Sequence, residues 1–215
     1  MQEKEFNLLD EPWIRVIQPD CSVKEVSLTD ALVNAHTYCD LRGELATQDI
    51  AVLRLLLAVL HTVFERVDAD NPSPPLPKLS WKDIKNRWKT LWDLGHFPAE
   101  PIQTYLNGQH EKFWLFHPER PFWQIPEMKQ GTKKYGVKKL NGTILESENK
   151  IRLFSTMNDA AKDELSYAEA ARWLLYVNAY DDTSAKASKE YKEQKKEAEK
   201  ESPSVGWLGQ LGLIS

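Results

Sequence analysis

Apolar residues recur at the helical period over residues 47–67, the most strongly patterned part of the chain. One stripe of side chains follows this period, namely Ile50, Leu53, Leu57, Leu60 and Phe64, widened by Leu56 and Val63. A helix with so wide an apolar stripe is expected to lie inside a protein core. The pattern therefore predicts a central buried helix.

Before this helix, the residues 13–17 (WIRVI) are compact and rich in β-branched side chains, which is typical of a strand. Residues 18–20 (QPD) have turn chemistry, and residues 23–28 are predicted to form the returning strand of a hairpin. Thr29 is then expected to cap a short helix that runs to Ala35.

After the central helix, residues 71–77 (NPSPPLP) contain four prolines and predict a stiff, extended connector. A second helix is expected to begin at Ser80, because Ser80 and Asp83 resemble a capping box, and to stop at Gly95. Its predicted inward face consists of Ile84, Trp88, Leu91 and Trp92.

Two more helices are predicted, over residues 98–106, ending at Asn107-Gly108, and over residues 166–180. The inward face of the later helix is predicted to hold Ala170, Trp173, Leu174 and Val177. The sequence shows no internal repeat. A hairpin combined with several helices indicates the α+β class: a mixed domain with a central buried helix and long loops.

Residues 113–126 (FWLFHPERPFWQIP) are too broken by proline to form a helix and too aromatic for a flexible linker. One interpretation is a hydrophobic plug that closes the core, with Glu119 and Arg120 exposed or paired, because Phe and Trp dominate core energetics. The other is a rigid platform for the segment that follows. Residues 128–139 contain five lysines and no acidic residue.

Lysine and glycine together suit phosphate contact, because lysine supplies charge and glycine allows backbone N–H groups to approach closely. Tyr135 within this window has a ring that can stack on a base. The alternative for residues 128–139 is a solvated surface loop. That alternative is stronger for residues 186–201, where six lysines are balanced by five glutamates.

Composition and charge argue against several classes of protein. The 215 residues have a formal net charge of −4, which argues against a whole-surface nucleic-acid binder but not against a local basic patch. Cys21 and Cys39 do not form a CxxC pair, the start of the chain has no signal peptide, and the apolar run 55–60 is short for a membrane span. We therefore expect a cytoplasmic protein with no membrane contact and with reduced thiols.

No catalytic motif is present in the sequence. The five histidines lack metal-ligand spacing such as HExxH, and no GxSxG, P-loop or GxGxxG segment occurs. His61 lies in the apolar helix, where a structural role is the simpler interpretation. We expect no enzyme activity, no metal and no cofactor.

Five phrases in order resemble one family. They are residues 6–14 (FNLLDEPWI), 26–32 (VSLTDAL), 51–61 (AVLRLLLAVLH), 115–124 (LFHPERPFWQ) and 206–209 (GWLG). Together they are similar to CasA, the large subunit of the type I-E CRISPR surveillance complex Cascade. Members of that family are longer and end in a four-helix bundle, which this sequence lacks. The resemblance implies that residues 1–215 are an N-terminal domain, incomplete at its C-terminal end.

The resemblance implies a non-enzymatic role in antiviral defence. The family lies beside the 5′ handle of the guide RNA (crRNA), reads the short motif flanking the target (the PAM), helps to open the target double-stranded DNA and docks a helicase-nuclease. Its implied partners are the crRNA, target DNA, other Cascade subunits and that effector. In such RNA-guided systems base pairing carries the sequence identity, and protein reads the flanking motif and the backbone.

The resemblance also places the nucleic-acid contacts. The family's mobile loop corresponds to residues 127–150 and extends toward residue 158, and a second, charged loop corresponds to residues 181–204. The implied nucleic-acid-binding residues are Lys129, Lys133, Lys134, Tyr135, Lys138, Lys139, Phe154, Lys186 and Lys189.

The second loop departs from the family, whose corresponding loop is rich in glycine, because residues 181–204 contain no glycine. Contacts from Lys186 and Lys189 would be side-chain contacts. A protein-interaction scaffold that touches only neighbouring subunits remains the alternative function.

Overall fold

Two of the β-rich segments near the start of the chain pair as an antiparallel hairpin in the computed structural model, which describes residues 4–66, 80–124 and 164–180. Strand β2 (Ile14–Ile17) pairs with β3 (Val23–Val26) on one side and with the short β4 (Asp40–Leu41) on the other. Ile14 and Val16 are buried, and Arg15 and Ile17 are half-buried. This alternation places one face of β2 against the core and confirms the predicted hairpin.

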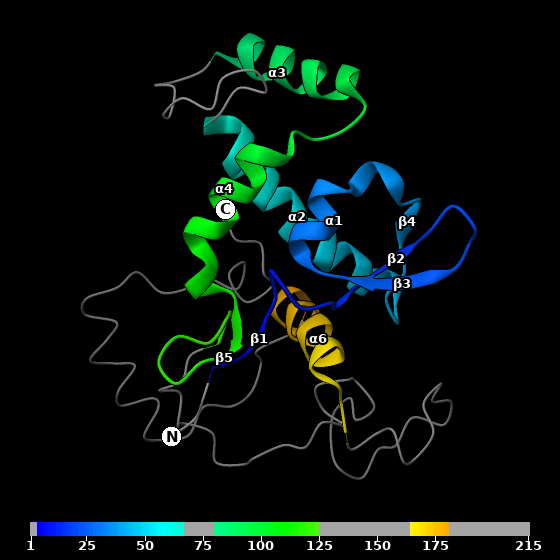
Figure 1. Ribbon diagram of the computed structural model, residues 1–215, viewed down its shortest axis with the longest axis vertical. Helices are drawn as coiled ribbons and strands as arrows, with labels where there is room; N and C mark the ends of the chain where they lie inside the picture. The colour runs from blue at the N-terminus through cyan, green and yellow to red at the C-terminus, as the bar shows by residue number, and fades with distance from the viewer. Residues whose placement is uncertain (1–3, 67–79, 125–163, 181–215) are drawn as a thin grey trace. The chain divides into compact units, whose positions relative to one another are not determined.

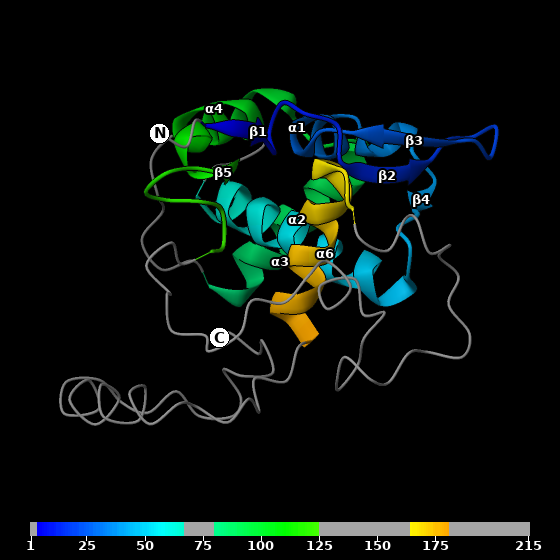
Figure 2. The same ribbon diagram turned by 90° about the horizontal axis from the view of Figure 1, so that it is seen from below.

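A second, two-stranded sheet joins the start of the chain to the aromatic stretch. Strand β1 (Glu5–Asn7) runs antiparallel to β5 (Trp114–Phe116). Figures 1 and 2 both show these strands side by side, although they lie far apart in the sequence. The aromatic stretch therefore contains a strand, which its prolines had hidden from sequence analysis.

Helices supply most of the remaining structure: α1 (Leu28–Val33), α2 (Ala46–Arg66), α3 (Trp81–Leu94), α4 (Ala99–Gln109) and α6 (Tyr167–Tyr180), with short 3₁₀ turns η1 (Ala35–Thr37) and η2 (His110–Lys112). The chain divides into two compact units at residue 122, and α6 belongs to the second. In the first unit α4 packs against α1 and α2. Strands and helices together confirm the α+β class, whereas the family's C-terminal bundle lies outside what the described residues can test.

Trp13 ties together the elements around the hairpin. Its side chain is fully buried, and its indole N–H donates a hydrogen bond of 2.8 Å to the carbonyl of Leu8. Its backbone N–H bonds to the carbonyl of Val26, and the N–H of Leu28 bonds to Leu8. A buried tryptophan needs such an acceptor, so the path of the chain from β1 into β2 is fixed by this ring.

The helix ends follow capping chemistry. Ser80 and Asp83 form the predicted capping box of α3, and Gly95 ends that helix in the left-handed region at φ 70°. A Cβ on Gly95 would meet no heavy atom within 4 Å, so its backbone conformation, not space, favours glycine there. Ser166 and Glu169 make the same reciprocal bonds before α6.

The predicted inward face of α2 is wrong in part. Leu56, Leu60, Val63 and Phe64 are buried, but Ile50, Leu53 and Leu57 are 40–48% exposed. The remaining buried positions among the described side chains of the helix are Gln48, Ala51, Val52, Leu55 and Val59. Because α2 is apolar on most of its circumference, periodicity alone cannot choose the face, and the packing partners decide it.

The inward face predicted for α3 is also wrong at one position. Trp92 is 85% exposed, whereas the buried positions are Arg87 and Leu91. Arg87 turns inward because its guanidinium Nη1 donates a hydrogen bond to the carbonyl of Phe64, near the C-terminal end of α2. Those last carbonyls have no partner within their own helix, so a buried arginine can satisfy one of them.

Two predicted helix ends moved. The cap of α1 is Ser27, whose Oγ accepts the N–H of Asp30 at 3.1 Å, so Thr29 lies inside the helix. Helix α4 continues through Asn107-Gly108 to Gln109 and leads directly into η2. Gly108 has no positive φ, so here the packing of α4 overrides the local turn signal.

The face of α6 agrees with the prediction only at Trp173, which is buried. Ala170, Leu174 and Val177 are half-buried. The other buried residues of this helix are Ala168, Ala171, Arg172 and Leu175. The wrong face was chosen because small alanines occur all round the helix and give a weak periodic signal.

Residues Ala46–Phe64 of α2 are long and apolar enough to cross a membrane by length and composition, which differs from the expectation based on the shorter run 55–60. Half of that window is buried inside the protein. A soluble core helix passes the same test, so this property of α2 agrees with the predicted central helix and gives only weak evidence for a membrane.

Candidate nucleic-acid interface

The residues predicted to contact nucleic acid all lie outside the described residues: Lys129, Lys133, Lys134, Tyr135, Lys138, Lys139, Phe154, Lys186 and Lys189. They stay predictions, as do the loop boundaries at 127–150 and 181–204. The structure describes instead the segment that leads into the first of these loops, up to Gln124.

The segment 113–122, which we call the loop base, is fastened at both ends. At its start, the carbonyl of Phe113 accepts the N–H of Leu8 at 2.9 Å, next to the β1–β5 pairing. At its end, the N–H of Phe122 bonds to the carbonyl of Trp114 at 2.8 Å. The first bond joins the loop base to the residue after β1 and the second closes the chain back on β5, so the loop base has a defined conformation.

His117 fixes the turn inside the loop base. Its ring nitrogen Nδ1 accepts the backbone N–H of Glu119 at 3.1 Å and that of Arg120 at 2.9 Å. The imidazole is 9% exposed, so these bonds are shielded from water. Because both neighbours donate to Nδ1, this nitrogen must be unprotonated. Pro118 and Pro121 restrict the backbone of the same turn.

Two phenylalanine rings of the loop base lie in the core, whereas its charged side chains lie at the surface. Phe113 and Phe122 are buried and stack with their centroids 5.4 Å apart, and Leu115 is 2% exposed. The side chains of Glu119 and Arg120 are exposed. These positions confirm the hydrophobic-plug interpretation for the two phenylalanines and the exposure of the central acid and base.

Trp123 differs from the other rings. It comes directly after the loop base, is 51% exposed and has a backbone φ of 50°. A positive φ is uncommon for a bulky residue and is held only by its surroundings. The chain therefore makes a sharp, defined change of direction just before the segment that holds the predicted lysines.

Two polar residues beside the loop base were missed by sequence analysis. Asn7 is 2% exposed; its Oδ1 accepts the N–H of Leu9 at 3.0 Å and its Nδ2 donates to the carbonyl of His110 at 3.1 Å. The Nε2 of His110 lies 2.7 Å from a carboxylate oxygen of Asp10. A buried Asn within FNLLDEPW was the available signal, because a buried amide must have partners.

Charges around β1 are paired. Lys4 bonds to Glu111, which lowers the pKa of that carboxyl group, and the Lys4 ammonium lies 6.0 Å from the ring centroid of Trp114. Among the described residues no group of three His, Cys, Asp or Glu side chains could hold a metal ion.

Comparisons with known proteins agree on one family. The family described as CRISPR-associated protein Cse1 matches residues 7–215. A curated relative, the CRISPR-associated protein CasA/Cse1 of Thermus thermophilus, is 34% identical over 177 residues, which cover 82% of this chain and 32% of the relative.

Solved structures give the same result. The crystal structure of Thermobifida fusca Cse1 is 30% identical, with a TM-score of 0.67, over 85% of this chain and 31% of that one. A chain in a structure titled CRISPR RNA-guided surveillance complex, pre-nicking, is 25% identical, with a TM-score of 0.66, over 81% of this chain and 34% of that one. The chain thus spans about a third of the length of these relatives. The match over residues 7–215 shows that the chain belongs to the Cse1 family of CRISPR-associated proteins.

Proposed function

We propose that the chain is a non-catalytic, nucleic-acid-contacting part of the large subunit of a CRISPR RNA-guided surveillance complex in the cytoplasm. The observation that carries this proposal is the family match across residues 7–215. A second support is that a similar chain occurs in a structure titled as such a complex. The partners are the crRNA, the target double-stranded DNA, the other subunits of the complex and a helicase-nuclease.

In this role the protein helps to recognise the PAM and to open the duplex beside the crRNA 5′ handle, and then docks the helicase-nuclease. Guide pairing reads the target sequence, so the protein needs only contacts to the flanking duplex and to phosphates. Lysine side chains supply such contacts without base specificity. The lysines of 128–139 are the proposed source, because they are the densest run of one charge sign in the chain.

The loop base favours this proposal because it limits the conformations of the chain just before the lysines. The bonds of His117 and Phe122 fix the path as far as Trp123. A lysine segment that starts from a fixed point loses less conformational entropy on binding than one on a free linker. The exposed Glu119 and Arg120 need no direct part in binding, since the turn depends on their backbone N–H groups.

A charge-reversal variant distinguishes nucleic-acid binding from the alternative function, a protein-interaction scaffold. Lys133→Glu with Lys134→Glu, in the assembled complex, is expected to weaken binding of a PAM-containing duplex while the complex still forms. The matched control is Lys24→Glu with Lys112→Glu, two exposed lysines of the first unit, which should leave binding unchanged. If the first variant binds DNA normally, the lysines are not the contact. Loss of assembly in that variant would favour the scaffold.

A further inference from the structure

Helix α3 exposes two tryptophans, which is unusual for a side chain of this size. Trp81 is 78% exposed and Trp92 is 85% exposed, the two highest values among the large hydrophobic residues of the described chain. Tryptophan is buried on average, so two such rings on one helix require an explanation. Successive residues turn by about 100°, so Trp81 and Trp92 lie on the same side of α3, about 16 Å apart along its axis.

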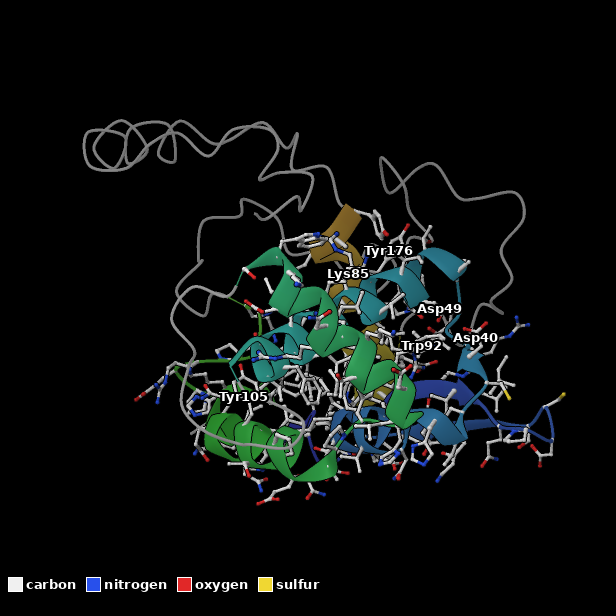
Figure 3. The ribbon with its side chains drawn as sticks, turned by 90° about the horizontal axis from the view of Figure 1, so that it is seen from above. Asp40, Asp49, Lys85, Trp92, Tyr105 and Tyr176 are labelled. Atoms are coloured by element: carbon white, nitrogen blue, oxygen red, sulfur yellow. The ribbon has the colours of Figure 1, made fainter. Side chains whose placement is uncertain are left out.

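Lysines occupy the same side of this helix. Lys85 lies one turn after Trp81, Lys89 follows one turn later, and both are exposed. Figure 3 labels Lys85 and Trp92 on α3. No ion pair joins Lys85 or Lys89 to another residue in the part of the chain that the structure describes. We call Trp81, Lys85, Lys89 and Trp92 the α3 stripe.

Acidic side chains are placed away from the centre of the stripe. The carboxylate of Asp83 is engaged by Ser80, accepting its N–H at 3.2 Å and its hydroxyl at 2.5 Å. Those bonds lower the pKa of Asp83 and hold its charge at the capping end of the helix. Asp93 follows Lys89 by one turn and lies at the edge of the stripe, as the helical spacing requires.

Helix α3 is anchored along the side next to the stripe, which gives the stripe a fixed support. Arg87 bonds to the carbonyl of Phe64, and Leu91 is 3% exposed. The ring of Trp88 meets that of His61 edge-on, with centroids 5.0 Å apart. These contacts belong to α2 and α3 and leave the α3 stripe facing solvent.

We propose that the α3 stripe binds single-stranded nucleic acid, through stacking of bases on Trp81 and Trp92 and through phosphate contacts from Lys85 and Lys89. Sequence-tolerant single-strand sites combine exposed aromatic rings with a positive track in this way. The site is separate from the lysine segment 128–139 and does not depend on it. It supplies a contact for a displaced or unpaired strand, which duplex recognition alone does not need.

The composition of the stripe favours nucleic acid over a protein partner. Lysine is depleted from the cores of protein interfaces, although tryptophan is enriched there. Here two exposed lysines lie between the two exposed rings, whereas the aliphatic residues of the same span, Ile84 and Leu91, are half-buried and buried. A protein partner would have to desolvate both ammonium groups, whereas phosphates would pair with them.

The test is a fluorescence titration of the full chain with labelled oligothymidylate and with a duplex of the same length. Trp81→Ala with Trp92→Ala should weaken single-strand binding by at least about tenfold, because one stacked base contributes about 1–3 kcal/mol. Lys85→Ala with Lys89→Ala should lower the slope of log affinity against log salt by about 1.4, at about 0.7 per contact. Both pairs are exposed, so thermal unfolding should stay unchanged and exclude a folding defect.

Two controls make the outcome decisive. Tyr167→Ala with Tyr180→Ala removes two other exposed rings and should leave single-strand binding unchanged. Lys133→Ala with Lys134→Ala tests the proposed duplex contact independently. If single-strand binding falls in this variant and not in Trp81→Ala with Trp92→Ala, the α3 proposal is rejected and the proposed function stands. Unchanged single-strand affinity in Trp81→Ala with Trp92→Ala overturns the α3 proposal. If Trp81→Ala with Trp92→Ala instead prevents only assembly with other subunits, the α3 proposal is also overturned and the α3 stripe is a protein-docking face.

Discussion

Replacing His117 with alanine removes the acceptor that holds the turn of the loop base. The Nδ1 atom accepts two backbone N–H groups, at 3.1 Å from Glu119 and 2.9 Å from Arg120. Alanine has no acceptor at this position, so both amides lose their partner. The loss should lower the free energy of unfolding and loosen the chain just before Trp123.

The magnitude follows from the two bonds. Each net hydrogen bond contributes about 0.5–1.5 kcal/mol, so the pair contributes about 1–3 kcal/mol. Since Glu119 and Arg120 have exposed side chains, water can reach their amides once the ring is gone, which favours the lower half of this range. For a chain of this size, each kcal/mol lowers Tm by about 2–4 °C.

The matched variant is His117→Asn. Its Oδ1 is as many bonds from the backbone as Nδ1 and has two lone pairs, so it can accept both N–H groups. Urea unfolding followed by tryptophan fluorescence should show His117→Asn to be more stable than His117→Ala. Equal destabilisation of the two variants would refute the hydrogen-bond argument and assign the effect to loss of ring packing alone.

Three further variants test other parts of the fold. Ser80→Ala should lower the free energy of unfolding by about 1 kcal/mol in a urea titration, since it removes the N-cap of α3. Leu106→Ala should lower it by about 2–5 kcal/mol in the same titration, because Leu106 is fully buried in α4. The pKa of Asp49 is raised from 3.8 by burial, and its carboxylate accepts the N–H of Gly43. Because the folded-state pKa is raised, the stability contributed by Asp49 falls as the pH rises above 3.8 through that folded-state pKa. In thermal unfolding, Asp49→Asn should therefore gain in stability relative to the parent chain as the pH rises above 3.8.

Local chemistry made part of the fold predictable. The hairpin of β2 and β3 followed from β-branched runs around a turn, and the capping box at Ser80 with the stop at Gly95 followed from residue types alone. Each of these features depends on a few neighbouring residues, so the sequence contains the whole cause.

Other features depend on partners that the sequence does not name. The pairing of β1 with β5 joins segments far apart in the chain, and the inward turn of Arg87 depends on the carbonyl of Phe64. The hydrophobic pattern predicted that Trp92 is buried, whereas the packing of α3 on α2 leaves its side chain exposed. The role of His117 was hidden for the same reason, since its acceptor function appears only once the turn is folded.

The candidate site was also predictable from the sequence only in part. The resemblance of LFHPERPFWQ to its family located the segment, and the structure shows how that segment is held. The lysines that follow stay a prediction from charge and resemblance. Their contribution to binding must be measured in solution.

The most direct measurement is a salt series for duplex binding by the full-length subunit within its complex, with and without Lys133→Ala, Lys134→Ala, Lys138→Ala and Lys139→Ala. Four lost phosphate contacts should weaken binding and lower the slope of log affinity against log salt by up to about 3.6, at about 0.9 per contact. The control pair Lys24→Ala with Lys112→Ala should retain the parent slope. An unchanged affinity and slope in the fourfold variant would contradict the proposed nucleic-acid contact.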